Sequence, residues 1–189
     1  MSVNEALVVY TDGACVKNPG PGGWAWVVPG PPPREGSGSS ISTTTNNRME
    51  LIAVLEAIKA LGDVGDLVIR SDSRYVVDGF TKWLAGWKHR GWVTGSKKPV
   101  KNRDLWEALD EVAARRGRSA LTLEWVRGHH GDRWNERADG LAEAAARRRP
   151  ADTDQEALDA AFDDALARDD ALDERLGLDL SRPATTLPT

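Results

Sequence analysis

The spacing of apolar residues changes once along this chain, near residue 46, and that change restricts the fold more than any other feature. Before it, short apolar or β-branched segments predict three strands in an antiparallel meander, at 6–10, 24–28 and 39–45, with a Pro/Gly/Ser-rich surface loop at 29–38. After it, helical spacing alternates with two further apolar strands. We expect helices at 51–61, about 75–80, 105–112 and 134–147, and strands at 67–69 and 121–125. This order predicts an α/β fold, with a mixed sheet and helices against its faces.

The charge divides the chain into two unlike parts. Residues 1–150 carry 22 Lys and Arg against 18 Asp and Glu, whereas residues 151–189 carry 3 against 11. We therefore expect one globular domain, large enough for an enzyme, at 1–149. An acidic C-terminal extension should follow at 150–189, as an amphipathic helix with a frayed end. The extension could be a solubilising helix packed on the body. It could instead cover a basic surface and compete with nucleic acid, or recruit a protein partner.

Several classes of protein are disfavoured by composition. No apolar run reaches the roughly 18–20 residues of a membrane span, and the first residues do not resemble a secretory signal. The single cysteine, Cys15, excludes an internal disulfide and a cysteine-based zinc site. We expect a cytoplasmic, monomeric protein without a membrane partner.

Four carboxylates stand where chemistry is plausible, although each has an ordinary structural explanation. Asp12 ends the first strand and could be a turn residue, and Glu50 could complete a helix cap begun at Asn47. Asp72 could cap the next helix, and Asp139 could be a solvated helix charge. If the first and fourth strands are parallel neighbours, however, Asp12 and Asp72 share one sheet edge, where α/β sheets bind ligands. Crowded carboxylates need cations, and all-oxygen ligands favour Mg²⁺ or Mn²⁺.

A series of motifs in a fixed order carries a more specific signal. The motifs are Thr11-Asp12-Gly13-Ala14-Cys15, Asn18-Pro19-Gly20-Pro21-Gly22-Gly23, Thr45-Asn46-Asn47-Arg48-Met49-Glu50, Ser71-Asp72-Ser73, Trp83…Trp87-Lys88…Arg90-Gly91-Trp92, Lys98-Pro99-Val100-Lys101-Asn102 and Gly128-His129-His130-Gly131…Asn135-Glu136-Arg137-Ala138-Asp139. Together they resemble type 1 ribonuclease H over residues 5 to about 147. The resemblance implies a five-stranded mixed sheet, three antiparallel strands followed by two parallel ones, flanked by helices.

The resemblance also implies a reaction. The family cuts the RNA strand of RNA–DNA hybrids, leaving 5′-phosphate and 3′-hydroxyl ends, and so removes RNA primers and R-loops. Two Mg²⁺ ions, or Mn²⁺, would be held by four carboxylates: Asp12, Glu50, Asp72 and Asp139. His129, in a glycine-bracketed loop, would assist proton transfer or product departure. Asn135 matches a position lining the same cleft, although capping of the last helix is an alternative.

Substrate contacts follow from the resemblance and from charge. The segment 79–103, called the basic segment below, contains seven Lys and Arg and no acidic residue. It resembles the family's DNA-gripping handle, with Trp83, Lys88, Lys97, Lys98 and Lys101 as binding residues and with Trp87 and Trp92 at least partly in the core.

The RNA strand would be recognised by contacts around Cys15, Asn18 and Glu50, with Asn46 in the minor groove and Thr45 in a pocket for a DNA phosphate. Thr43 stands where some relatives carry an arginine, which predicts a weaker pocket. Cys15 has no activating base beside it in sequence and is not expected to be a nucleophile. Other nucleases of the same fold and a non-catalytic hybrid-binding module are the competing functions.

Overall fold

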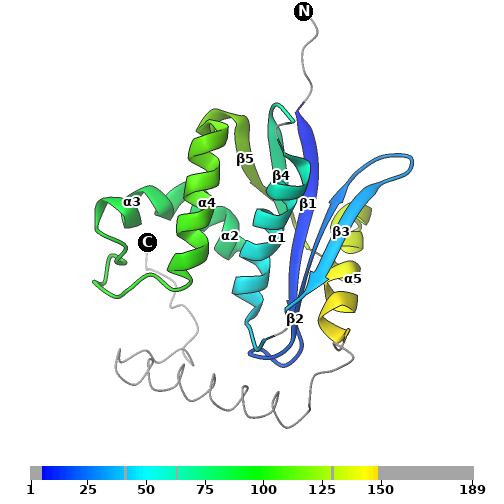
Figure 1. Ribbon diagram of the computed structural model, residues 1–189, viewed down its shortest axis with the longest axis horizontal. Helices are drawn as coiled ribbons and strands as arrows, with labels where there is room; N and C mark the ends of the chain where they lie inside the picture. Colours follow the sequence, from blue (N-terminus) through cyan, green and yellow to red (C-terminus); the bar gives the residue numbers. More distant parts are fainter. Residues whose placement is uncertain (1–5, 41, 63, 129, 149–189) are drawn as a thin grey trace, which may run out of the picture.

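The computed structural model describes residues 6–40, 42–62, 64–128 and 130–148. Five strands form one sheet in the order β3-β2-β1-β4-β5 (Figure 1). The strands are β1 (Leu7–Cys15), β2 (Gly22–Val28), β3 (Arg34–Ser39), β4 (Leu67–Ser71) and β5 (Leu121–Trp125). β1, β2 and β3 pair antiparallel, while β4 and β5 continue the sheet parallel to β1. The predicted mixed sheet of three antiparallel and two parallel strands is confirmed.

Helices cover both faces of this sheet. They are α1 (Asn46–Leu61), α2 (Arg74–Asp78), the π-helical turn η1 (Gly79–Trp83), α3 (Leu84–His89), α4 (Arg103–Arg116), the 3₁₀ turn η2 (Arg118–Ala120) and α5 (Arg133–Arg147). Side chains alternate across a strand, so Val9 points into the main core with α1 and α4, whereas Tyr10 packs with Ala138 of α5 on the other face. Figure 1 shows α1 and α5 on either side of the sheet.

The third strand lies earlier than predicted. It occupies 34–39, of which 34–38 was expected to be loop, rather than 39–45. The tryptophans of β2 explain the difference: a Cβ on Gly36 would lie 2.6 Å from the ring of Trp26, and one on Gly38 2.5 Å from the ring of Trp24. Glycine is a poor strand former in general, but here it makes room for the facing indoles.

The first strand runs further than predicted. β1 continues through Asp12 to Cys15 because β2 pairs with it as far as Cys15 and Gly22. Asp12 is therefore inside a strand and is not a turn residue. On its other side β1 pairs with β4 so that Tyr10 meets Arg70, 60 positions later, and the pairing ends there. The same offset of 60 positions places Asp12 beside Asp72, as expected for two residues at one edge of the sheet.

Among the described residues, no helix is long and apolar enough to cross a membrane. The acidic extension expected at 150–189 lies outside the described residues.

Candidate active site

Three acidic side chains from different parts of the chain converge at the carboxyl end of β4. Asp12 of β1, Glu50 of α1 and Asp72 each offer a carboxylate oxygen, and these oxygens lie within 4.8 Å of one another. Asp12 is 6% exposed, so at least one carboxylate of this cluster is buried in the protein. Such a group of hard oxygen donors suits a divalent cation of the Mg²⁺ or Mn²⁺ type.

Glu50 reaches the cluster because the backbones of β1 and α1 approach very closely at Gly13. A Cβ on Gly13 would lie only 2.2 Å from the Glu50 backbone nitrogen, so glycine permits this approach. The helix begins at Asn46, five residues before the predicted start at 51: Thr45 is the N-cap and its hydroxyl accepts a hydrogen bond from the Arg48 N–H at 3.4 Å. The predicted cap at Asn47 is wrong, and Glu50 is not a capping partner.

Asp72 is held by its neighbours on several sides. Oδ2 accepts a hydrogen bond from the Asn135 amide at 3.0 Å, and a Cβ on Gly128 would lie 2.3 Å from the same oxygen. Ser73, not Asp72, caps α2 by accepting from the Val76 N–H. The capping alternative for Asp72 is therefore wrong.

The last helix brings two polar side chains to the cluster. Asp132 caps α5 by accepting from the Trp134 and Asn135 N–H groups, so the capping alternative for Asn135 is wrong as well. Asn135 is 2% exposed and points at Asp72. Asp139 follows one turn later, and its charge acts on both Asp12 and Glu50. The fourth predicted carboxylate thus lies near the cluster of Asp12, Glu50 and Asp72.

The cluster is electrostatically costly without a cation. Burial, followed by the charges of Asp72 and Asp139, raises the pKa of Asp12 to about 8, against a small lowering by the Gly13 N–H. Burial and the charges of Asp12 and Asp72 raise the pKa of Glu50 well above its ordinary value. Glu50 Oε2 is also buried without a hydrogen-bond partner. An unpartnered carboxylate oxygen beside two other carboxylates is the arrangement that a bound divalent cation would satisfy.

Four predicted substrate-contacting residues gather where the β1–β2 turn meets the start of α1. The Asn18 Oδ1 accepts from the Asn46 N–H at 3.1 Å, next to the N-cap Thr45. The Cys15 thiol donates to the carbonyls of Gly20 and Thr44, and burial raises its pKa. These contacts agree with the prediction that Cys15 is not a nucleophile. Predicted His129 lies outside the described residues.

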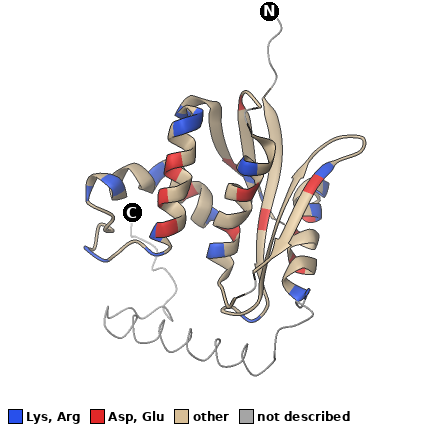
Figure 2. Cartoon of the chain, in the orientation of Figure 1, with Lys and Arg blue, Asp and Glu red and all other residues tan. Residues whose placement is uncertain are grey.

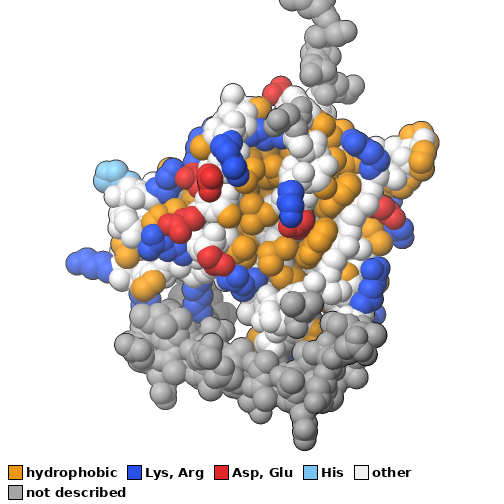
Figure 3. All heavy atoms as spheres, viewed as in Figure 1, with side chains coloured by type: hydrophobic (Ala, Val, Ile, Leu, Met, Phe, Trp, Pro, Cys, Tyr) orange, Lys and Arg blue, Asp and Glu red, His pale blue; other side chains and the backbone are white. Residues whose placement is uncertain are grey.

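The basic segment 79–103 forms the end of the molecule that carries α3. Figure 2 shows basic residues without acidic ones along α3 and the loop after it, and Figure 3 shows Lys and Arg side chains projecting from this end. Trp83 is 41% exposed, whereas Trp87 is buried edge-on against Trp106 with ring centroids 5.4 Å apart, and Trp92 packs against the core. The expected division between an exposed tryptophan and packed ones is present.

The predicted lysines of this segment differ in their surroundings. Lys97 and Lys101 are exposed and Lys98 is half-buried. Lys88 makes an ion pair with Asp110 of α4 at 2.5 Å, so part of its charge is already neutralised inside the protein. A contact between Lys88 and a phosphate would have to compete with that pair.

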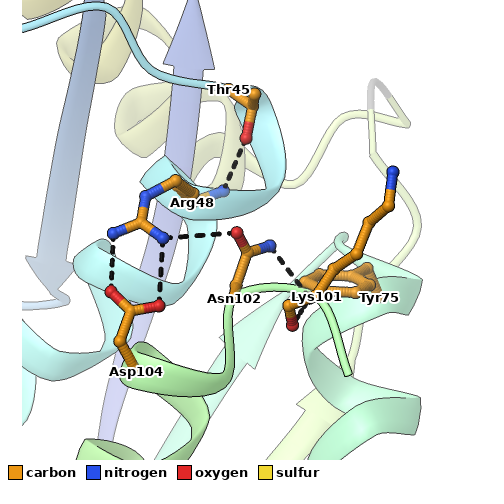
Figure 4. Close-up of polar contacts among 6 residues, drawn as sticks. All are labelled: Thr45, Arg48, Tyr75, Lys101, Asn102 and Asp104. Carbon is orange, nitrogen blue, oxygen red and sulfur yellow. Dashed lines mark hydrogen bonds and ion pairs between the residues drawn. The ribbon is translucent and has the colours of Figure 1, made fainter. Parts of the chain in front are cut away.

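A polar network missed by the sequence interpretation ties this segment to α1 (Figure 4). Two guanidinium nitrogens of Arg48 donate to the two carboxylate oxygens of Asp104, at 3.0 and 2.7 Å, and Arg48 also donates to Asn102 Oδ1 at 3.4 Å. Asn102 in turn donates to the Tyr75 hydroxyl at 3.0 Å. Arg48 and Asp104 are 56 positions apart, and nothing in their spacing marks them as partners.

Comparisons with known proteins agree with this geometry. The RNase H family model matches residues 4–147. The chain is 47% identical over 142 residues to the ribonuclease H of Hyphomonas neptunium, covering 75% of this chain and 93% of that protein. It is 52% identical over 134 residues to the ribonuclease H of Rhizobium meliloti, covering 71% and 86%.

Solved structures give the same result. LC9-RNase H1, described as a type 1 RNase H with the type 2 active-site motif, superposes with a TM-score of 0.63 at 35% identity over 75% of this chain and 72% of that chain. LC11-RNase H1, solved in complex with an RNA/DNA hybrid, gives a TM-score of 0.55 at 26% identity over 74% and 96%. The sheet order, the carboxylate cluster and these matches lead to one conclusion: this chain belongs to the ribonuclease H family of endoribonucleases.

Proposed function

We propose that this enzyme hydrolyses the RNA strand of RNA–DNA hybrids with two divalent ions, Mg²⁺ or Mn²⁺, leaving 5′-phosphate and 3′-hydroxyl ends. One observation carries the proposal: the unpartnered, buried Oε2 of Glu50 lies in a cluster with Asp12 and Asp72, where burial and then mutual repulsion raise the pKa of Asp12 and of Glu50. When bound, the ions would supply an activated water and would stabilise negative charge on the leaving oxygen.

The chain's own residues divide the work of the site. Asp12, Glu50, Asp72 and Asp139 would hold the ions, and Asn135 would keep Asp72 oriented by donating to Oδ2. His129, by the family resemblance, would assist proton transfer or product departure. Because His129 lies outside the described residues, its role rests on that resemblance alone.

Hybrid binding is proposed to involve two surfaces. Cys15, Asn18, Asn46 and Thr45 would contact the hybrid where the β1–β2 turn meets α1, including 2′-hydroxyls that only the RNA strand offers. The basic segment would follow the DNA strand through Trp83, Lys88, Lys97, Lys98 and Lys101. The similarity to LC11-RNase H1, which was solved with an RNA/DNA hybrid, supports this assignment of substrate.

The remaining expectations stay proposals of the same account. The catalytic domain would comprise residues 1–149, within which the family match at 4–147 falls. The enzyme would act in the cytoplasm as a monomer and would remove RNA primers and R-loops. The acidic extension would be a solubilising amphipathic helix packed on the body rather than a segment that covers the basic segment and competes with nucleic acid.

A strand-labelled hybrid tests the proposal. The full chain should cut only the RNA strand of the hybrid, in Mg²⁺ or Mn²⁺, and should leave duplex RNA and duplex DNA intact, with no cutting in EDTA. Cleavage of DNA would point to another nuclease chemistry on this fold. Tight hybrid binding without cutting in either metal would point to a non-catalytic binding module.

A further inference from the structure

An exposed aromatic–arginine pair stands beside the carboxylate cluster and has no role in the account above. Trp125, the last residue of β5, is 38% exposed. The guanidinium carbon of Arg74, at the start of α2, lies 3.6 Å from the centre of its ring. An exposed tryptophan this close to a predicted active site calls for an explanation that core packing does not supply.

The indole is fixed relative to Asp72. Trp125 pairs with Ser71 in the parallel β4–β5 ladder, and its Nε1–H donates to the Asp72 carbonyl at 3.0 Å. Three residues further on, Gly128 lies against the Asp72 carboxylate. The ring therefore holds Arg74 at a defined place next to a proposed metal ligand.

The charge of Arg74 is not neutralised locally. Within the ranges that the structure describes, no carboxylate forms an ion pair with Arg74, whereas Arg48, Arg70, Arg103, Arg115, Arg118, Arg137 and Arg147 each have one. Stacking uses only the flat face of a guanidinium. Its N–H groups lie in the plane of the group and stay available at the edge, in the fork that matches a phosphate.

We propose that Arg74, positioned by Trp125, binds a phosphate of the RNA strand close to the cleaved bond. The proposal rests on the proposed function, because it takes the strand nearest the Asp12–Glu50–Asp72 cluster to be the RNA. A phosphate is favoured over a base because the ring already covers one flat face of the guanidinium, while the unpaired positive charge needs an anion.

Salt dependence gives the sharpest test. Hybrid binding is measured in the Asp12→Asn background, so that the RNA is not cut, from about 50 to about 300 mM salt. Adding Arg74→Gln should weaken binding about three- to tenfold at low salt and make the slope of log affinity against log salt shallower by roughly one. Arg74→Lys should keep the slope, because the charge remains. Trp125→Leu should also keep it while lowering affinity, because only the positioning is lost.

A control removes one arginine charge elsewhere, at an exposed residue that pairs loosely with Glu111 at 3.7 Å. Arg115 lies in the last turn of α4 beside Arg116, which donates to the Gly65 carbonyl ahead of β4, at the opposite end of that strand from Asp72. Arg115→Gln should leave both the affinity and the slope unchanged. Uncharged methylphosphonate linkages, placed singly along either strand, identify the contacted phosphate. A methylphosphonate next to the cut in the RNA strand should weaken hybrid binding by Asp12→Asn. It should leave hybrid binding by the double variant Asp12→Asn/Arg74→Gln unchanged.

Two results would overturn the inference. One is an unchanged salt slope for Arg74→Gln, with or without a fall in melting temperature, which would make the pair purely structural. The other is a sensitive phosphate that lies in the DNA strand. Failure of the wild-type chain to cut the hybrid would instead overturn the proposed function, so the two failures are distinguishable.

Discussion

The side-chain amide of Asn135 donates a hydrogen bond of 3.0 Å to Oδ2 of Asp72, across 63 positions of sequence. Asn135 is 2% exposed, and its own Oδ1 is buried without a partner. The residue is thus held by α5 with its donor toward the acidic cluster. A neutral donor at this point orients Asp72 without adding charge of either sign.

Replacing Asn135 with aspartate should impair the site more than its small change in shape suggests. Asn135→Asp removes the only donor of that side chain and adds a carboxylate next to Asp72. We expect hybrid cleavage to fall at least about tenfold, and metal-free stability to fall by about 1–3 kcal/mol, the cost of an unsatisfied buried polar group. Steady-state cleavage and thermal melting in EDTA measure the two effects. Wild-type cleavage by this variant would contradict the orienting role.

The raised pKa of Asp12 predicts an unusual pH dependence of stability. In the folded, metal-free protein the pKa is about 8 against an ordinary 3.8, so the folded state binds more protons between these values. The contribution of Asp12 to stability is therefore present below pH 4 and is lost as pH rises toward 8. Asp12→Asn, which carries no charge, should melt roughly 5 °C above wild type at pH 8 in EDTA and close to it at pH 4.

Saturating Mg²⁺ gives the internal control for that experiment. The metal should raise the melting temperature of the wild type at pH 8 and should have a smaller effect on Asp12→Asn, because binding to the folded state stabilises it. Equal melting curves for the two proteins in EDTA at pH 8 would mean that burial and the neighbouring carboxylates do not destabilise the ionised Asp12 side chain.

The Arg48–Asp104 pair predicts a defect in substrate binding rather than in chemistry. The pair lies at the surface, and the Arg48 guanidinium holds the pKa of Asp104 below its ordinary value. Since exposed pairs add less than about 1 kcal/mol, Asp104→Asn should leave stability nearly unchanged. It should raise KM for the hybrid about two- to fivefold at constant kcat, because only the weaker Arg48–Asn102 contact then ties the basic segment to α1 through Arg48.

Glu107→Gln is the matched comparison for Asp104→Asn. It removes one carboxylate from the same helix, where Glu107 pairs with Arg103 one turn away at 2.9 Å and with no other basic residue that the structure describes. Its KM should remain at the wild-type value. The same rise in KM for both variants would indicate a general effect of charge and not of the link to α1.

Removal of the acidic extension should leave catalysis intact. A chain ending at Arg149 retains the family match at 4–147 and all four carboxylates of the site. We expect unchanged kcat and unchanged hybrid affinity across a salt series. Tighter hybrid binding at low salt after truncation would favour the alternative in which the extension competes with nucleic acid.

Sequence periodicity predicted the order of the five strands and of helices α1, α2, α4 and α5, because strands and helices bury apolar residues at different spacings, but it did not predict α3. It failed for β3, where Gly36 and Gly38 resemble loop residues in isolation. Their role becomes visible only when Trp24 and Trp26 of the neighbouring strand lie over them. It also ended β1 too early at the polar Asp12, since pairing with β2 carries the strand on to Cys15.

The candidate functional residues divide in the same way. Asp12, Glu50, Asp72 and Asp139 were found because each belongs to a short motif and the motifs occur in order. Arg74 and Trp125 were missed, as were Arg48 and Asp104, because each pair joins positions about 50 apart in sequence, 51 and 56. Contacts of this kind depend on the register of the strands and on where helices begin, neither of which a single sequence specifies to one residue.

The most direct test of the account compares cleavage of a strand-labelled RNA–DNA hybrid by the full chain and by Asp12→Asn, both in Mg²⁺ and with folding checked by thermal melting. The account predicts that the wild type cuts the RNA strand to products with 5′-phosphate ends, and that Asp12→Asn is folded, no less stable and inactive. Undiminished cutting by a folded Asp12→Asn would contradict the central claim that the cluster around Asp12 carries the reaction.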